Sequence, residues 1–277
     1  MQLILLEKQL VVFFPINKKQ NTNNTNLYLI MTSIYPDKMA EIYDAMYQSF
    51  IDYDKEYSFY NNLLQKSNPK SILEIGSGTG NLAKRFVDNH QNYTGLDYSK
   101  SMIDISENRN PNSNFIHGDM RDFNLNEKVD AIIITSRSTS YLISNNDLND
   151  TFSSLHKNLN DEGVIIFDFI DANRFIPYIK ETPLIVHSAQ HKHINYIRKS
   201  NWQVSLHDNF ILEWTAKYYQ NEIEDNKIVA NDYATVRVFT LNEIQLFLYL
   251  NHFEIIEIID RKTYAYDTFV IVAKKKS

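Results

Sequence analysis

The sequence predicts an α/β fold built on a doubly wound, seven-stranded, mostly parallel sheet with an antiparallel β insertion. Short apolar segments alternate with longer amphipathic ones from about residue 71 to residue 170. That alternation is typical of parallel strands joined by crossover helices. Several strand segments are continuously apolar, as at residues 131–134, which indicates strands covered on both faces.

Residues 1–30 are expected to form an extension outside this fold. Glu7 to Gln9 interrupt its apolar stretches, and an Asn/Thr-rich run follows at 20–26. A run of this composition cannot pack into a core, and neither apolar stretch reaches the ~20 residues of a membrane span. No signal-peptide cleavage site is apparent, and Met31 is a candidate alternative start.

The core is expected to begin with helices. Apolar and aromatic residues recur every three or four positions across 38–64, which predicts an amphipathic helical region. Beyond it the pattern predicts strands at 71–74, 92–97, 114–117, 129–134 and 164–170, and helices at 81–89, 99–109 and 145–159. Ser99 is the expected N-cap of the second of these helices.

The pattern changes after residue 180. Residues 181–238 mix β-branched, aromatic and polar side chains, which favours an antiparallel insertion. Thr240 and Glu243 then have the spacing of a capping box at the start of a final helix. Strands at 254–259 and 268–273 complete the sheet, so we expect a core at 31–180, an insertion at 181–238 and a return to the core at 239–277.

Charge and cysteine content exclude several classes of function. The 277 residues carry 28 Lys and Arg against 34 Asp and Glu, a net charge of −6, so no overall positive field attracts nucleic acid. The absence of cysteine excludes disulfides, Cys-ligated zinc, iron–sulfur clusters and thiolate nucleophiles. We therefore expect a cytoplasmic protein that binds neither nucleic acid nor a membrane.

Three of the six glycines, Gly76, Gly78 and Gly80, fall between the first strand and the first helix of the alternation. Glycines there let the backbone turn tightly and approach a ligand at a helix N-terminus; an ordinary turn is the alternative. Asn81 stands where a dinucleotide fingerprint needs its third glycine. No P-loop Lys-Ser/Thr or dehydrogenase Tyr-x-x-x-Lys pair occurs, so a nicotinamide enzyme is the second interpretation.

Two carboxylates follow neighbouring strands. Asp97 ends the second strand, where it could accept both ribose hydroxyls of an adenosine-like ligand. Asp119 follows the third strand, where it could accept from an adenine amine while Met120 lies against the ring. Either residue alone would be an ordinary surface charge, but together they indicate an adenosine site.

These residues resemble class I S-adenosylmethionine-dependent methyltransferases over roughly residues 38–277, and segments 40–44, 118–123 and 136–142 are similar to small-molecule amino-sugar N,N-dimethyltransferases. The resemblance implies a Rossmann-like fold, S-adenosylmethionine as cofactor and methyl transfer to a small molecule, in particular at an amine nitrogen. The cofactor-binding residues that it implies are Glu74, Gly76, Ser77, Gly78, Gly80, Asp97, Tyr98, Met102, Asp119, Met120 and Ser136.

The acceptor side departs from the sugar enzymes. Where they often carry a histidine, this chain has Tyr141, whose ordinary pKa of ~10 suits orientation better than proton removal. We expect Tyr43 and Tyr141 to line the methyl-transfer site and Arg137 to anchor the substrate, although packing is the alternative for any of the 18 tyrosines. A non-catalytic cofactor-binding module and a homodimer are both left open.

The insertion contains an acid-free stretch at 182–207, which includes His187, Lys199 and His207. His191 and His193 are expected to share a strand face, but no carboxylate accompanies them, so no metal site is predicted. The stretch favours recognition of an acidic substrate group, with Arg198 as its ligand because a guanidinium matches carboxylates and phosphates.

Overall fold

The computed structural model describes residues 37–89, 92–206, 208, 210–221 and 226–276. The chain divides into two units, residues 1–34 and 35–277, and the description below concerns the second. The expected extension at 1–30 and His207 lie outside the described residues. Within the described ranges, no helix has both the length and the apolar character needed to cross a membrane.

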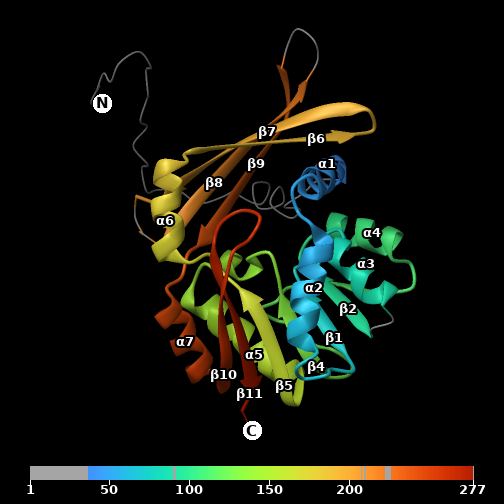
Figure 1. Ribbon diagram of the computed structural model, residues 1–277, viewed down its shortest axis with the longest axis vertical. Coiled ribbons are helices and arrows are strands. Elements are labelled where there is room, and N and C mark those ends of the chain that lie inside the picture. The colour runs from blue at the N-terminus through green and yellow to red at the C-terminus, as the bar shows by residue number, and fades with distance from the viewer. Residues whose placement is uncertain (1–36, 90–91, 207, 209, 222–225, 277) are drawn as a thin grey trace, which may run out of the picture. The chain divides into compact units, whose positions relative to one another are not determined.

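The main sheet has seven strands in the order β10-β11-β5-β4-β1-β2-β3, which confirms the predicted fold class (Figure 1). β11 runs antiparallel to both β5 and β10, whereas the other pairs are parallel. The strands are β1 Ile72–Ile75, β2 Tyr93–Asp97, β3 Asn114–His117, β4 Val129–Ile134, β5 Leu159–Asp168, β10 Phe253–Arg261 and β11 Thr268–Lys275. The strand order reverses between β4 and β1, the place where ligands bind in open α/β sheets.

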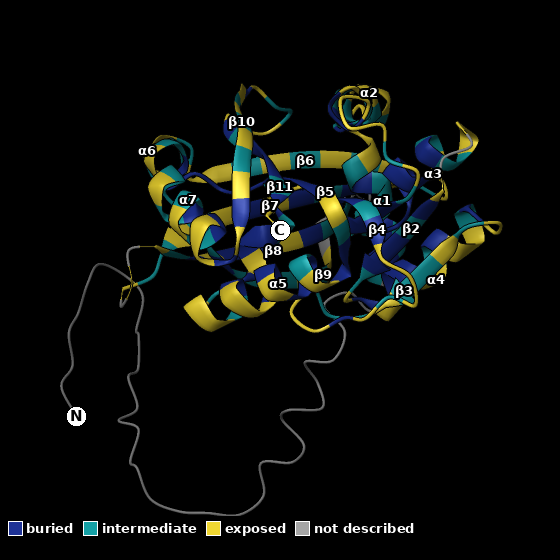
Figure 2. Cartoon of the chain, turned by 90° about the horizontal axis from the view of Figure 1, so that it is seen from below, coloured by how far each residue is buried: buried dark blue, intermediate teal, exposed yellow. Residues whose placement is uncertain are grey.

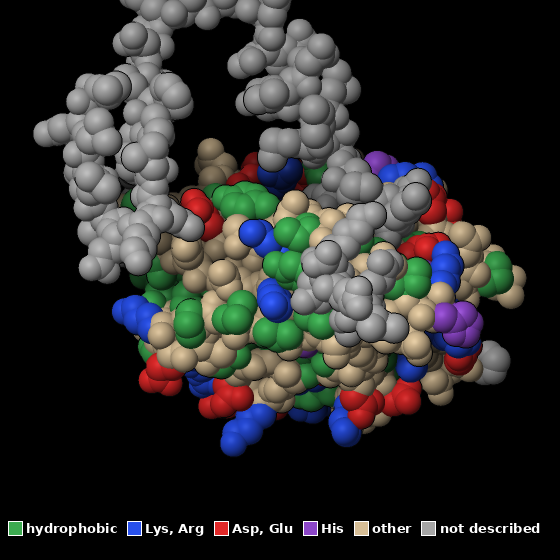
Figure 3. Space-filling model, turned by 90° about the horizontal axis from the view of Figure 1, so that it is seen from above, with side chains coloured by type: hydrophobic (Ala, Val, Ile, Leu, Met, Phe, Trp, Pro, Cys, Tyr) green, Lys and Arg blue, Asp and Glu red, His purple; other side chains and the backbone are tan. Residues whose placement is uncertain are grey.

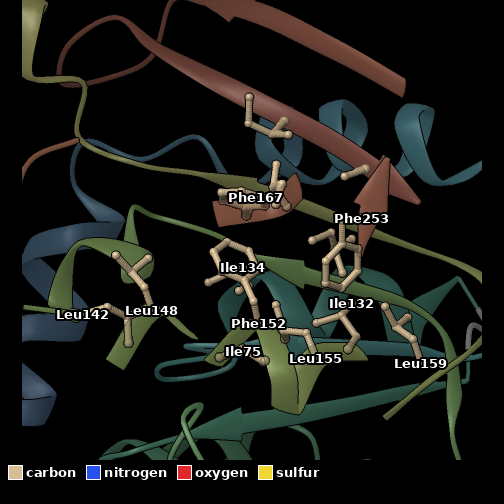
Figure 4. Packing of buried hydrophobic residues seen from close by; sticks show 14 of the residues in the cluster. Ile75, Ile132, Ile134, Leu142, Leu148, Phe152, Leu155, Leu159, Phe167 and Phe253 are labelled. Atoms are coloured by element: carbon tan, nitrogen blue, oxygen red, sulfur yellow. The ribbon is translucent and has the colours of Figure 1, made fainter. Parts of the chain in front are cut away.

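Helices cover both faces of this sheet, which explains why its strands are apolar on both sides. On one face α5 (Asn145–Asn158) and α7 (Leu241–Leu250) pack against the strands, and Ile132, Ile134 and Phe167 lie beside Phe152 of α5 (Figure 4). On the other face α2 (Tyr53–Leu64) and α3 (Asn81–Asp88) cover the alternate residues. α4 (Lys100–Arg109) packs on β2 and β3. In Figure 2 the exposed residues of α5 and α7 lie on the outer sides of these helices.

A second sheet of four antiparallel strands follows, in the order β6-β7-β8-β9. Its strands are β6 Leu184–His191, β7 Ile194–Val204, β8 Ile211–Asn221 and β9 Asn226–Arg237. Two helices pack against one face of it: α6 (Ala172–Glu181) on Leu212 and Val236, and α1 (Asp37–Gln48) on Trp214 and Tyr218. In Figure 1, α1 lies between this sheet and the helices α3 and α4. The face seen in Figure 3 carries acidic and basic side chains among apolar ones.

One local expectation is wrong, the shared strand face of His191 and His193, and two features go beyond the sequence analysis. The helical region at 38–64 is two helices, because the chain turns after α1 and Asp52 caps α2 by accepting from the Lys55 amide. His191 and His193 do not share a strand face, since Lys192 and His193 have φ of 48° and 66° and form the turn between β6 and β7. α6 was not anticipated, and it contains Pro177.

Candidate functional site

The three glycines of the loop between β1 and α3 all have positive φ, 73° at Gly76, 54° at Gly78 and 74° at Gly80. A Cβ on Gly76 would overlap Ser138, and one on Gly80 would come within 2.7 Å of the Asn110 amide nitrogen. A Cβ on Gly78 would meet no atom within 4 Å. Gly76 and Gly80 therefore let the loop pack, whereas Gly78 presents its backbone to open space.

Asp97, at the end of β2, holds this loop from the neighbouring strand. One carboxylate oxygen accepts a hydrogen bond from the Gly78 amide and the other from the Ser99 amide, each at 2.8 Å. Burial raises the pKa of Asp97, although these two amides act in the opposite direction. Each oxygen can accept a further hydrogen bond, so the carboxylate can serve a ligand as well as the loop.

Helix α1 is tied to the loop through Asp44, a contact that the sequence analysis missed. The Asp44 carboxylate accepts from the Thr79 hydroxyl at 2.5 Å and from the Asn81 amide at 2.8 Å. Arg109 of α4 donates to both carboxylate oxygens, at 3.1 and 2.7 Å, and to the Thr79 carbonyl at 2.5 Å. The glycine loop, α3 and α4 therefore all bond to one carboxylate of α1.

Glu74 lies in β1 below the loop and is 2% exposed. Its carboxylate accepts from the Tyr93 hydroxyl at 2.5 Å and from the Thr135 hydroxyl at 3.1 Å. Burial raises its pKa to about 7, against the effect of these two hydroxyls. Its position favours a role in holding β1, β2 and β4 in register over direct contact with a cofactor.

The other residues expected to contact the adenosine part of the cofactor differ in their exposure and in their bonding partners. Asp119 is bonded to the Arg121 guanidinium at 2.6 Å, and these bonds lower its pKa although burial acts to raise it. Met120 is partly buried against the main core. Tyr98 is 48% exposed, and Met102 is 3% exposed in a cluster with residues of α1.

Ser77 is 5% exposed, and among the described residues its hydroxyl has no hydrogen-bond partner. Ser136 is exposed and has a φ of 56°. It follows β4 at the edge of the sheet that also carries the glycine loop, because β4 and β1 are parallel neighbours. Both serines therefore remain candidates for ligand contact.

Arg137, which was expected to anchor the substrate, is buried. Its amide donates to Asp168 at 2.7 Å, and its guanidinium donates to the Thr263 hydroxyl at 2.5 Å and to the Tyr266 carbonyl at 3.2 Å. The same group lies 4.4 Å from the centre of the Tyr266 ring. These contacts hold the loop between β10 and β11 against the end of β4, and the role of Arg137 as a substrate anchor stays a prediction.

The two tyrosines expected at the acceptor site come from different elements. Tyr43 of α1 stacks on Tyr47 at 3.9 Å between ring centres. Tyr141 ends the 3-10 helix Ser138–Tyr141 that follows β4 and is 45% exposed. Both lie on elements that contact the glycine loop or the strand end beside it, which is compatible with the predicted role.

An S-adenosylmethionine molecule fits the residues that are present. The open space at Gly78 and the remaining acceptor capacity of Asp97 lie side by side, joined by the hydrogen bond between them. Asp97 would hold the ribose and Gly78 would allow the close backbone approach. This pair lies at the carboxyl ends of β1 and β2, beside the reversal of strand order.

Comparison with known proteins adds independent findings. Residues 72–163 match the protein family described as "Methyltransferase domain". The chain is 29% identical over 137 residues to the dTDP-3-amino-3,6-dideoxy-alpha-D-glucopyranose N,N-dimethyltransferase of Streptomyces fradiae, which covers 48% of this chain and 54% of that enzyme. It is 29% identical over 138 residues to the dTDP-3-amino-3,4,6-trideoxy-alpha-D-glucopyranose N,N-dimethyltransferase of Streptomyces venezuelae, covering 49% and 58%.

The alignments thus span a little more than half the length of these relatives. The crystal structure of Streptomyces venezuelae DesVI has the same fold, with a TM-score of 0.72 and 19% identity over 88% of this chain and all of that one. The nicotinamide interpretation is not favoured, because the matched family and these relatives are methyltransferases. Residues 72–163 are therefore similar to a methyltransferase domain, and the chain shares the fold of Streptomyces venezuelae DesVI, in agreement with the motif resemblance.

Proposed function

We propose that the protein transfers a methyl group from S-adenosylmethionine to an amine nitrogen of a small molecule. The observation that carries this proposal is the pairing of Gly78 with Asp97 at the strand ends, next to open space. The amine is proposed because the relatives from Streptomyces are named as N,N-dimethyltransferases of amino sugars. The absence of cysteine supports a cytoplasmic location.

The chain's part in this reaction is to bind and orient. S-adenosylmethionine supplies a methyl group already activated by a sulfonium. Asp97 and the glycine loop would fix the cofactor, while Tyr43 and Tyr141 would direct the acceptor nitrogen toward the methyl group. Alignment of this kind supplies several kcal/mol of the barrier without a strong base, and an acceptor amine needs only to arrive neutral.

The substrate is proposed to be small and to carry an acidic group. The second sheet lies over α1, which itself contacts the glycine loop through Asp44, so its inner face is close to the proposed transfer site. Arg198 lies on that face and is treated in the next section. A nucleotide-linked amino sugar, as in the names of the relatives, has both the amine and the acidic group.

A methyl-transfer assay tests this proposal. The protein is incubated with S-adenosylmethionine carrying a labelled methyl group and with matched pairs of nucleotide-linked sugars that differ only in an amino or a hydroxyl group. Label in the amino member alone is expected, and Asp97→Ala should reduce it strongly when S-adenosylmethionine is not saturating. Label only in the hydroxyl member would replace N-methylation by O-methylation, and a folded protein that does not bind S-adenosylhomocysteine would contradict the methyltransferase proposal altogether.

A further inference from the structure

The inner face of the second sheet carries a row of polar side chains. His187, Arg198 and Tyr218 are cross-strand neighbours on β6, β7 and β8. Asp232 of β9 pairs with Ala216, which belongs to the buried cluster that packs on α1 together with Tyr218. Directly opposed residues of antiparallel strands project from the same face, so all four side chains lie on the side of the sheet that α1 covers.

The Arg198 guanidinium is packed among aromatic rings and makes a hydrogen bond, but it forms no ion pair with a described carboxylate. It is 4% exposed, and its guanidinium lies 5.2 Å from the ring centre of Tyr47 and 5.7 Å from those of Phe50 and Trp214. Its Nη2 donates to His187 Nδ1 at 3.0 Å. Among the described residues, no carboxylate lies within ion-pair distance of it. Burial raises the pKa of Asp232 to about 6, and the nearby charge of Arg198 acts in the opposite direction. A buried guanidinium that makes no direct ion pair is unusual, because burial of an unpaired charge is costly.

Several polar atoms around Arg198 lack partners. Within the described ranges, the Arg198 Nε and Nη1, the Tyr218 hydroxyl and Asp232 Oδ2 make no hydrogen bond of acceptable geometry. The Tyr47 and Tyr218 hydroxyls nevertheless lie near enough to the guanidinium to act on its pKa, which they raise against the effect of burial. Tyr218 is fully buried, and Asp232 uses its other carboxylate oxygen to accept from the Tyr233 amide at 2.8 Å. Buried polar atoms in native proteins are nearly always paired, so the donors and the one acceptor of this cluster have hydrogen-bonding capacity that a polar ligand can use.

Helix α1 connects this cluster to the proposed transfer site. Asp44 binds the glycine loop, and Tyr47, three residues further along, faces the Arg198 guanidinium. Phe50 lies 4.3 Å from the His187 ring and 5.9 Å from the Tyr264 ring, and Tyr264 in turn accepts from Arg137, directly after Ser136, at 3.2 Å. The cluster is therefore linked by continuous contacts to the strand ends.

We propose that Arg198 and Tyr218 bind an acidic group of the methyl acceptor, a carboxylate or a phosphate, and that Asp232 accepts a hydrogen bond from a hydroxyl or amine of the same molecule. This proposal rests on the proposed function. An acidic group supplies the charge that Arg198 lacks and the acceptors that Nε, Nη1 and the Tyr218 hydroxyl require. A donor on the ligand satisfies Asp232 Oδ2.

The guanidinium itself provides the readout. The full chain, labelled with ¹⁵N and saturated with S-adenosylhomocysteine, is titrated with inorganic phosphate, pyrophosphate or acetate while the arginine Nε–Hε resonances are followed by NMR. The Arg198 resonance is the one missing from Arg198→Lys. It is expected to shift with a saturating profile, and the anion that saturates it at lower concentration distinguishes a phosphate-bearing from a carboxylate-bearing acceptor.

Two variants and a matched control sharpen this test. Tyr218→Phe removes only the hydroxyl and should weaken anion binding about tenfold, the usual effect of one lost hydrogen bond to a charged group. Arg198→Lys should weaken it at least as much, because a lysine lacks the guanidinium's set of fixed donors. Lys199→Gln changes an exposed cation on the opposite face of the same strand and should leave anion binding unchanged.

The outcomes separate this proposal from the proposed function. If no anion shifts the Arg198 resonance in protein that binds S-adenosylhomocysteine, or if Lys199→Gln weakens binding as much as Tyr218→Phe, the acidic site is wrong and the methyltransferase proposal stands. If the protein does not bind S-adenosylhomocysteine but phosphate still shifts the resonance, the anion site is correct and the proposed function fails. If Tyr218→Phe still binds S-adenosylhomocysteine, this variant is folded.

Discussion

Replacing Asp44 by alanine removes the carboxylate on which α1, the glycine loop and α4 converge. The change removes one acceptor from each of the Thr79 hydroxyl, the Asn81 side-chain amide and the Arg109 guanidinium, although Asn81 keeps its bond to the Thr79 hydroxyl at 3.0 Å. Breaking a buried ion pair costs ~3–5 kcal/mol. Here the side chains of Arg109 and Asp44 are 21% and 13% exposed, and Arg109 keeps its bond to the Thr79 carbonyl. We therefore expect a loss of about 2–3 kcal/mol in the free energy of unfolding.

Urea denaturation measures this loss, with Glu41→Ala as the matched control. Glu41 lies one turn earlier on α1 and pairs with Lys192 at the surface, with side chains 45% and 67% exposed, so its removal should cost less than ~1 kcal/mol. Because the loop is also displaced, Asp44→Ala should bind S-adenosylhomocysteine more weakly, whereas Glu41→Ala should not. Equal stability of the two variants within about 0.5 kcal/mol would refute the structural role of Asp44.

The stabilisation by Asp44 should also depend on pH. Burial acts to raise the pKa of Asp44, but its bonds to Arg109, Thr79 and Asn81 outweigh burial and hold the pKa below its ordinary value. The contribution is therefore fully present above the unfolded pKa of ~3.9 and is lost as the pH falls through the lower folded value. The difference in unfolding free energy between the wild type and Asp44→Ala should shrink as the pH falls below about 3.9.

Two further predictions concern the loop and the strand beneath it. Gly78→Ala and Gly80→Ala both place a side chain at positive φ, at a cost of ~1–2 kcal/mol, but only the Cβ at position 80 would meet neighbouring atoms. Urea denaturation should therefore show the larger loss of stability for Gly80→Ala. In calorimetry, Gly78→Ala should show the larger loss of S-adenosylhomocysteine affinity relative to its own loss of stability. The reverse order in these two measurements would contradict the assignment of open space to Gly78. Burial raises the pKa of Glu74 to about 7, so the folded state binds more protons than the unfolded state between pH ~4.3 and 7, and this group lowers stability as the pH rises through that range. Glu74→Gln should remove that part of the pH dependence in urea titrations at the two ends of the range, and an unchanged slope would show that the carboxylate is not perturbed by burial.

Much of the fold could be predicted because its strands are short, apolar and separated by clear helix signals. Ser99 caps α4 and Thr240 forms a capping box with Glu243, both as predicted. β6 and α6 could not be predicted with the same ease. β6 alternates exposed and half-buried residues without a strong apolar face, and α6 contains Pro177, so packing against the rest of the protein determines both.

The glycine loop was predictable because positive φ favours glycine at all three positions. Arg137 was not, because its burial depends on the loop that carries Thr263 and Tyr266, more than a hundred residues away in the sequence. The same holds for Asp44, whose partners lie in α3, α4 and the glycine loop. A sequence pattern reports which residues are present locally, whereas these contacts depend on which elements the fold brings together.

The central claim is that S-adenosylmethionine binds at Gly78 and Asp97, and calorimetric titration with S-adenosylhomocysteine tests it most directly. The wild type is expected to bind in the micromolar range, and Asp97→Ala to bind about ten- to a hundredfold more weakly, the equivalent of ~1.5–3 kcal/mol for a charge-assisted pair of hydrogen bonds. Asp104→Ala, an exposed carboxylate on α4, should bind like the wild type. No binding by folded wild-type protein, or a change of less than twofold in Asp97→Ala, would contradict the claim.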